Sequence, residues 1–250
     1  MKKLSFGQHH VFVYNSAGEL KQAAAEHIRL ACAARAKQKG KVSIALSGGS
    51  TPVGVYKNLL SADSTDNAPP FPWEQSIFFF GDERYVSHDD IQSNYRMAKE
   101  AFLEDAPIKH DQIYPVPTDC EQAEDCALRY ADQLSILNKQ DNIPIFDYVL
   151  LGMGEDGHTA SLFPDTSIID EQLKYVAAVY VEKFQQWRIS LTFPVLNKSQ
   201  VCSVLVVGEE KATVLAEVIK NNNHSFPVGM IENNNGINWF VDQAAARNLL

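Results

Sequence analysis

The fold of this chain is decided by the stretch Gly152-Met153-Gly154-Glu155-Asp156-Gly157-His158-Thr159-Ala160-Ser161. It follows residues 148–151, an unbroken apolar run that is typical of a buried strand. Open α/β sheets bind their ligands at the carboxyl ends of their strands, where a strand runs into a glycine-rich turn. The stretch therefore predicts an α/β fold with a functional site at this turn.

Patterns of helix and strand alternate along the rest of the chain. Ser16 and Glu19 fit a capping box, and helical spacing follows to about residue 39, where Gly40 is a stop signal. Pro52 fits the first turn of a second helix that ends near residue 60, followed by a surface loop at residues 61–72. The other expected elements are strands at residues 42–46, 77–80, 176–181, 188–193 and 201–207, and helices at residues 94–102 and 209–220. Because there is no internal repeat and no clear linker, we predict one α/β domain over residues 1–250 with a mostly parallel sheet.

Composition excludes several classes of protein. The chain has 250 residues and a formal net charge of −9, which argues against a nucleic-acid binder. No run approaches the roughly 18 apolar residues of a membrane span. The first residues are charged but are not followed by the apolar segment of a secretory signal, so we expect a cytoplasmic protein.

The four cysteines, Cys32, Cys120, Cys126 and Cys202, show no C-x-x-C spacing, and we expect all of them to be reduced thiols. The histidines at residues 9, 10 and 88 are expected on the solvated surface rather than at a metal.

The first chemical motif is the glycine-rich segment at residues 47–52, between an expected strand and an expected helix. Backbone amides can converge in such a turn, and the helix dipole favours an anion there. The hydroxyl groups of Ser47, Ser50 and Thr51 add donors. The segment lacks the lysine of nucleotide triphosphatases and the last glycine of a serine-hydrolase elbow. We therefore predict phosphate binding, with an ordinary strand–helix turn as the alternative.

The second motif, at residues 81–86, places charged side chains directly after an apolar strand. Arg84 could hold a phosphate or a carboxylate in bidentate fashion, and Asp82 or Glu83 could orient it or contact sugar hydroxyls. A structural ion pair is the alternative. Asn94 follows shortly, where taken alone it indicates only the start of a helix.

The third motif contains His158, two residues after Asp156. A histidine titrates near neutral pH, so His158 is the candidate general base or acid and Asp156 its orienting partner. The same residues match the dinucleotide pattern G-x-G-x-x-G. Two carboxylates would then face the pyrophosphate, and Pro164 leaves little room for the long helix that should follow. We therefore reject nicotinamide or flavin binding.

Together these motifs resemble the 6-phosphogluconolactonase family. The resemblance extends from residue 47 to residue 212, and its most specific part is residues 152–164. It implies a Rossmann-like, open and mostly parallel sheet of the kind that sugar-phosphate isomerases use. It also implies hydrolysis of 6-phospho-D-glucono-1,5-lactone to 6-phosphogluconate in the oxidative pentose phosphate pathway, without a metal or organic cofactor. The expected partner is this small molecule, with no nucleic acid and no membrane, for a monomer or a small homo-oligomer.

The resemblance also implies roles for individual residues. His158 matches the catalytic histidine of the family, and Arg84, Arg188 and Lys211 match its cations. The resemblance does not assign which group of the substrate each of these three cations contacts. The candidate catalytic residues are thus His158 and Asp156. The candidate substrate-binding residues are Ser47, Gly48, Gly49, Ser50, Thr51, Asp82, Arg84, Asn94, Gly154, Arg188 and Lys211.

Two alternatives are kept. A glucosamine-6-phosphate deaminase-like isomerase would share the Asp-Gly-His loop, but that family typically continues with an Asn-Glu pair, which is missing after Thr159. A non-catalytic sugar-phosphate sensor of the same fold would be expected to lose the histidine or its aspartate, and this chain has both.

Overall fold

A seven-stranded sheet forms the centre of the molecule in the computed structural model, which describes residues 1–61 and 69–250. Its order is β1 (Lys2–Phe6), β2 (His9–Tyr14), β12 (Ile237–Asp242), β11 (Cys202–Val206), β8 (Tyr148–Gly152), β3 (Val42–Leu46) and β4 (Ser76–Phe80). All neighbours from β2 to β4 are parallel, and only β1 is antiparallel. The predicted mostly parallel sheet is therefore confirmed.

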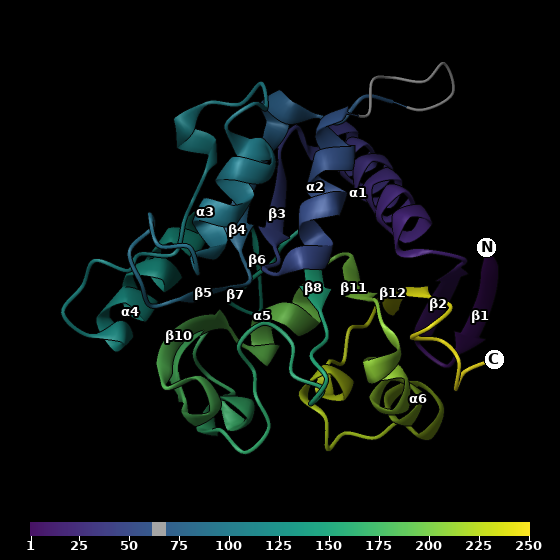
Figure 1. Ribbon diagram of the computed structural model, residues 1–250. Coiled ribbons are helices and arrows are strands. Elements are labelled where there is room, and N and C mark those ends of the chain that lie inside the picture. The colour runs from purple at the N-terminus through teal and green to yellow at the C-terminus, as the bar shows by residue number, and fades with distance from the viewer. Residues whose placement is uncertain (62–68) are drawn as a thin grey trace.

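The described chain has six α-helices: α1 (Ala17–Lys39), α2 (Ser50–Ser61), α3 (Asn94–Ala98), α4 (Ala123–Gln133), α5 (Phe193–Lys198) and α6 (Ala212–Asn221). Figure 1 shows α1 and α2 on one side of the sheet and α5 and α6 on the other. Short 3-10 turns lie at Trp73–Gln75, His110–Gln112, Leu134–Ile136, Ser167–Asp170, Glu182–Phe184, Glu209–Lys211 and Pro227–Met230. No helix in the described ranges is long and apolar enough to cross a membrane.

The predicted limits of the first helix are confirmed. The Ser16 side chain accepts a hydrogen bond from the Glu19 backbone at 3.2 Å, and Gly40 ends the helix in the left-handed region at φ 78°. The Glu19 carboxylate accepts from the backbone N–H of Asn15, at 3.2 Å, where a capping box would use Ser16. The helix expected over residues 94–102 is α3 followed by a π-helical turn at Lys99–Leu103. Only part of the expected surface loop at residues 61–72 lies within the described residues.

The strands expected at residues 176–181 and 188–193 exist but do not join the central sheet. β9 (Val176–Val181) and β10 (Gln186–Leu191) pair antiparallel with each other, and β10 also pairs with β5 (Asp82–Arg84). The second strand ends two residues early because Pro194 favours the start of α5.

The helix α4 packs against β9 and β10. A further two-stranded sheet joins β6 (Lys139–Gln140) to β7 (Ile143–Pro144). The small three-stranded sheet brings residues 84 and 188 together, which sequence periodicity did not predict.

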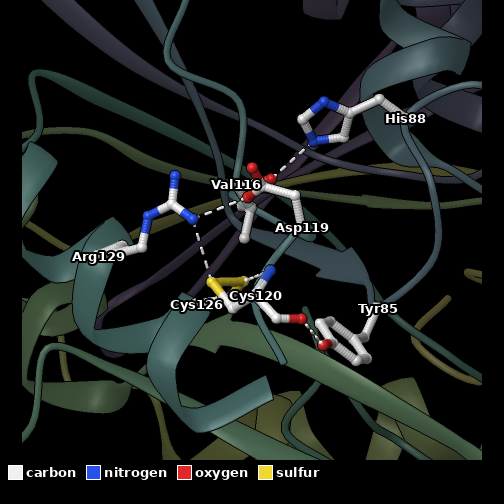
Figure 2. The surroundings of a disulfide bond; sticks show 7 residues. All are labelled: Tyr85, His88, Val116, Asp119, Cys120, Cys126 and Arg129. Carbon is white, nitrogen blue, oxygen red and sulfur yellow. Dashed lines mark hydrogen bonds and ion pairs between the residues drawn. A yellow bond between two sulfur atoms is a disulfide. The ribbon is translucent and has the colours of Figure 1, made fainter. Parts of the chain in front are cut away.

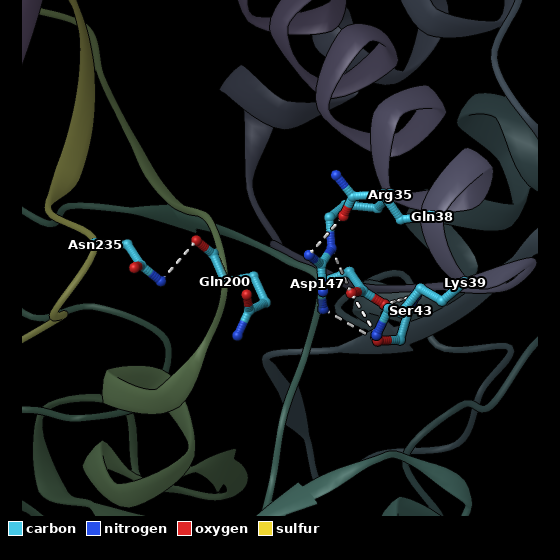
Figure 3. A network of polar contacts seen from close by, with 7 residues as sticks. All are labelled: Arg35, Gln38, Lys39, Ser43, Asp147, Gln200 and Asn235. Atoms are coloured by element: carbon cyan, nitrogen blue, oxygen red, sulfur yellow. Dashed lines mark hydrogen bonds and ion pairs between the residues drawn. The ribbon is translucent and has the colours of Figure 1, made fainter.

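The amino end of the central sheet is closed by a polar network around Asp147 (Figure 3). This buried carboxylate accepts hydrogen bonds from the backbone N–H and the hydroxyl of Ser43, at 3.0 and 3.1 Å. It also pairs with Arg35 at 3.0 Å and Lys39 at 2.7 Å, both at the end of α1. The Asp147 carboxylate at this end of β3 and β8 thus has protein partners for both of its oxygens. The open turns lie at the opposite, carboxyl end of these strands.

The expectation of four reduced cysteines is wrong for two of them. Cys120 and Cys126 form a disulfide, with Cα atoms 5.5 Å apart, whereas Cys32 and Cys202 are free and buried. The segment before α4 folds back on the first turn of that helix, so residues six apart in sequence meet. In Figure 2 the Tyr85 hydroxyl donates a hydrogen bond to the Cys120 carbonyl. The disulfide thus lies against the residue that follows Arg84.

The expectation of a solvated histidine at position 9 is also wrong. His9 is only 4% exposed, and its Nδ1 accepts a hydrogen bond from the indole of Trp239 at 3.1 Å. His88 is half-buried, and its Nε2 lies 2.8 Å from the carbonyl of Val116. Both rings are therefore held by protein groups.

Candidate active site

A cavity of about 350 Å³ lies at the carboxyl ends of the central strands. It gathers twelve of the thirteen candidate residues, namely Ser47, Gly48, Gly49, Ser50, Thr51, Asp82, Arg84, Asn94, Gly154, His158, Arg188 and Lys211. The thirteenth, Asp156, contacts His158. Segments that are far apart in the sequence meet here because parallel strands end at one edge of the sheet.

The turn after β3 is held in an open shape around the start of α2. The buried hydroxyl of Tyr56 accepts from the backbone N–H of Ser47 and donates to its carbonyl, each at 2.8 Å. Gly49 has φ 98°, a conformation that favours glycine. A Cβ on Gly48 would lie 2.1 Å from Oδ1 of Asn94, so only glycine leaves room for that amide. The turn presents the N-terminus of a twelve-residue helix to the cavity, which is a suitable place for an anion.

Asp82 and Glu83 organise the site from within. The Asp82 carboxylate accepts from the hydroxyl of Ser161 at 2.7 Å, and Asn94 donates to the Asp82 carbonyl at 2.9 Å. Glu83 is fully buried and caps α3 by accepting from the backbone N–H groups of Asn94 and Tyr95, at 2.7 and 2.8 Å. Burial raises the pKa of Glu83, and these hydrogen bonds act against that rise. Neither carboxylate pairs with Arg84 among the described contacts, which leaves that cation available.

Arg84 and Arg188 lie side by side as cross-strand neighbours of β5 and β10. The Nε group of each is buried without a hydrogen-bond partner in the described part of the chain. Arg188 is 7% exposed, and its guanidinium lies 5.3 Å from the ring centroid of Phe184. The pKa of Arg188 is lowered by burial and by the positive charge of Arg84. Two adjacent cations with free N–H groups make this part of the cavity a site for an anion, and Lys211 lines the same cavity.

His158 lines the same cavity and forms a pair with Asp156. His158 Nδ1 lies 2.5 Å from Asp156 Oδ1, and Lys183 Nζ lies 3.0 Å from Asp156 Oδ2. The hydrogen bond with His158 lowers the pKa of Asp156 well below its usual range, so the carboxylate is ionised. An ionised carboxylate only accepts hydrogen bonds, and Nδ1 must therefore carry the proton. In the neutral imidazole, Nε2 then carries the lone pair, which is the state that a general base requires.

Gly154 makes room for this imidazole. A Cβ at position 154 would lie 2.1 Å from His158 Nδ1 and 2.8 Å from Asp156 Oδ1. We expect Gly154→Ala to displace the ring and to lower kcat/KM about 100-fold, because a misplacement of about 1 Å is enough for such a loss.

The control for this prediction is Gly18→Ala. A Cβ at position 18 of α1 would meet only the Ser16 hydroxyl, at an ordinary 3.7 Å. Steady-state kinetics of both variants test the prediction, and equal activity of Gly154→Ala and wild type would contradict it.

Several residues of the site were not predicted from the sequence. The Phe163 ring stacks on His158 with centroids 4.0 Å apart, and Phe184 packs edge-to-face against Phe163. Lys183 pairs with Asp156, and Ser161 with Asp82. Phe163 and Ser161 lie within residues 152–164, the most specific part of the resemblance, but nothing in their spacing indicates these partners. Lys183 and Phe184 lie in the turn between β9 and β10, which carries no motif.

Comparison with known proteins agrees with this geometry. The sequence model described as glucosamine-6-phosphate isomerases/6-phosphogluconolactonase matches residues 15–239. The chain belongs to this family.

Individual members of the glucosamine-6-phosphate isomerase/6-phosphogluconolactonase family are similar to the chain over most of its length. It is 35% identical to a 6-phosphogluconolactonase of Synechocystis, a match covering 85% of this chain and 86% of the relative. The human 6-phosphogluconolactonase is 33% identical, with 95% and 92% covered. The solved structure of 6-phosphogluconolactonase from Trypanosoma cruzi superposes with a TM-score of 0.85 at 30% identity, covering 100% and 99% of the two chains. The Rossmann-like fold that the resemblance implied is thus confirmed.

The other branch of the family shares the fold alone. A monomeric glucosamine-6-phosphate deaminase superposes with a TM-score of 0.78 at 21% identity, covering 95% of this chain and 99% of that chain.

Proposed function

We propose that this chain hydrolyses 6-phospho-D-glucono-1,5-lactone to 6-phospho-D-gluconate, the second step of the oxidative pentose phosphate pathway. The observation that carries the proposal is one cavity lined by His158, whose Nδ1 is bonded to Asp156, and by Arg84 and Arg188, whose Nε groups have no hydrogen-bond partner among the described residues. The family members reported above, which bear the name of this activity, support it. The substrate is a small molecule with a phosphate remote from its reacting carbonyl.

In the proposed reaction, His158 removes a proton from water as that water attacks the lactone carbonyl. Proton transfer of this kind contributes typically 10²–10⁴-fold to rate. The tetrahedral intermediate carries an oxyanion that backbone N–H groups or an arginine would stabilise. The protonated His158 then gives its proton to the departing ring oxygen. One water molecule is consumed, because its oxygen joins the carbonyl carbon and its proton passes through His158 to the ring oxygen.

The phosphate would be bound by Arg84, Arg188 and Lys211 with the amides of residues 47–51. These groups attract an anion locally, although the chain carries a net charge of −9. Anchoring the phosphate at one end orients the carbonyl at the other, and orientation supplies much of the rate gain. Ser47, Ser50, Thr51 and Asn94 add polar groups to the same wall of the cavity.

The location, oligomeric state and cofactor needs of the protein are proposed from the same function. We place the protein in the cytoplasm, as a single domain over residues 1–250 that acts as a monomer or a small homo-oligomer. We propose neither a metal nor an organic cofactor, because the reaction needs only water, a base and an anion site.

The deaminase alternative is less well supported. The segment after His158 reads Thr159-Ala160-Ser161 and has no carboxylate there, whereas the deaminase pattern places an Asn-Glu pair. Ser161 is turned toward Asp82, at 2.7 Å. A non-catalytic sensor is disfavoured because His158 and Asp156 are both present and paired.

The deciding experiment measures hydrolysis of freshly generated 6-phosphogluconolactone. The product is followed by NADPH formation through the next dehydrogenase of the pathway, against a control without enzyme, because the lactone also opens spontaneously. We expect strong acceleration. No acceleration by folded protein would overturn the proposal, and glucosamine-6-phosphate would then be assayed.

Arg84→Ala tests the anion site. The Arg84 guanidinium lines the cavity, and its hydrogen bond to the Gln92 carbonyl, at 2.5 Å, fixes its position. The substitution therefore removes one positioned positive charge from the cavity. We expect KM for the phosphorylated lactone to rise about 10-fold, since a hydrogen bond to a charged group contributes about 1.5–3 kcal/mol. Inhibition by inorganic phosphate should weaken in parallel.

Arg129→Ala is the matched control for the Arg84 variant. Arg129 is exposed and bonds Asp119 at 2.8 Å, away from the residues that line the cavity. An unchanged KM for Arg84→Ala would remove Arg84 from the anion site. The rate with unphosphorylated glucono-1,5-lactone should stay close to that of wild type, since that substrate lacks the phosphate.

A further inference from the structure

The turn between β9 and β10 reaches the catalytic pair from the side. Lys183 Nζ donates to Asp156 Oδ2 at 3.0 Å, while Asp156 Oδ1 accepts from His158 Nδ1 at 2.5 Å. Each carboxylate oxygen therefore has its own partner. Lys183 lies 27 residues beyond Asp156, in the turn between two strands of the three-stranded sheet, so this contact joins two separate parts of the fold.

Phe184, the residue after Lys183, is linked to the same histidine through the ring of Phe163. The Phe184 ring packs edge-to-face on Phe163, with centroids 5.7 Å apart, and Phe163 stacks on His158. The turn is compact, because Gln185 adopts φ 50° and its backbone N–H donates to the Glu182 carbonyl at 3.1 Å. Two consecutive side chains of one rigid turn thus act on the hydrogen-bond partner and the stacking partner of His158.

We propose that Lys183 is a positioning residue for the lactonase reaction. It fixes the Asp156 carboxylate so that Oδ1 holds the proton of His158 on Nδ1 and leaves Nε2 as the base. This inference rests on the proposed function, because it names what keeps the proposed base in its reactive tautomer.

The physical reason lies in the freedom of the carboxylate. The terminal torsion of an aspartate is broad, so a carboxylate with one partner can rotate. Asp156 is half-buried and accepts hydrogen bonds from the side chains of His158 and Lys183, which both favour its ionised form. The Lys183 side chain is 60% exposed, and exposed ion pairs add little to stability. The loss of Lys183 should therefore affect catalysis and leave the melting temperature unchanged.

Lys183→Met tests this role, because methionine keeps the length of the side chain and removes its charge and donors. We expect kcat to fall about 10-fold with KM unchanged, as small misplacements of catalytic groups have effects of this order or greater. Lys183→Arg, which keeps a donor and a positive charge, should restore most of kcat.

The matched control is Lys198→Met. Lys198 Nζ lies the same 3.0 Å from a carboxylate oxygen, that of Asp141, but does not line the cavity. It should keep wild-type kcat.

A second readout does not depend on the substrate. Nitrogen NMR of the free protein, with ¹⁵N-labelled histidine, reports which ring nitrogen of His158 carries the proton. The wild type should show Nδ1–H, and Lys183→Met should show a mixture with Nε2–H. This measurement stands even if the wild type fails to accelerate lactone hydrolysis, a result that would refute the proposed function alone.

Three outcomes would overturn the inference. The first is a Lys183→Met variant with the kcat and the tautomer of wild type. The second is an effect confined to KM, which would mean that Lys183 contacts the substrate instead. The third is an equal loss of kcat in Lys198→Met, which would indicate a general effect of removing a surface charge.

Discussion

Replacing His158 by asparagine should lower kcat about 10²–10⁴-fold, the usual contribution of a general base. Asparagine is close in size to the part of the imidazole that meets Asp156, so it can still donate to Oδ1 while lacking the basic nitrogen. The fold should persist, because His158 is half-buried and its backbone bond to Gly154, at 2.9 Å, does not involve the ring. Lactone hydrolysis above the spontaneous rate measures the loss.

The control for His158→Asn is His110→Asn, at an exposed residue outside the cavity. Circular dichroism of both variants checks that the fold is intact. If His158→Asn, correctly folded, keeps near wild-type kcat, another group must activate the water and the proposed mechanism fails.

Replacing Arg188 by methionine should lower kcat/KM about 10²–10³-fold. A buried guanidinium can give a phosphate two charge-assisted hydrogen bonds, which together amount to about 3–6 kcal/mol. Each 1.4 kcal/mol corresponds to a factor of ten, so the lower part of that range already gives this loss. Methionine keeps an unbranched apolar stem against Phe184, which now packs beneath the guanidinium.

The thermal stability of Arg188→Met, unlike its activity, should not fall. Burial and the charge of Arg84 lower the pKa of Arg188, which means that the fold disfavours its charged form. A neutral residue removes this cost, so Arg188→Met should melt at or above the temperature of the wild type in the absence of ligand. Inorganic phosphate should raise the melting temperature of the wild type but not of the variant.

Thermal melts with and without phosphate, together with kinetics, check both parts. A variant that loses both activity and stability would show that Arg188 is chiefly a structural residue.

Much of the candidate site could be predicted from sequence because its motifs directly follow strands. The turns after β3, β4 and β8 all begin at the carboxyl ends of parallel neighbours, so their residues meet without any knowledge of register. His158 and Asp156 lie two residues apart, which makes their pairing a local property. For these residues the positions followed from local pattern alone, while their roles stay predictions.

Two of the contacts that escaped prediction are non-local. Arg84 and Arg188 meet because β5 pairs with β10 in one particular register, and a shift by one residue would turn one of them away. Lys183 reaches Asp156 only because the turn after β9 bends back over the cavity. The disulfide between Cys120 and Cys126 is local and was missed for a different reason, since it depends on how the chain enters α4 and not on a spacing rule.

The position of β12 has a consequence for how the chain folds as it is synthesised. β2 is held in the central sheet by β12, which is made after the other strands of this sheet, and Figure 1 shows both chain ends on this side of the molecule. Ribosomes add about 5–20 residues per second, so the β1–β2 hairpin waits on the order of 10–40 s with one edge unpaired. An unpaired strand edge is a template for aggregation. The nascent chain is therefore vulnerable at the β1–β2 hairpin, and a truncation that removes β12 would leave the edge of β2 exposed permanently.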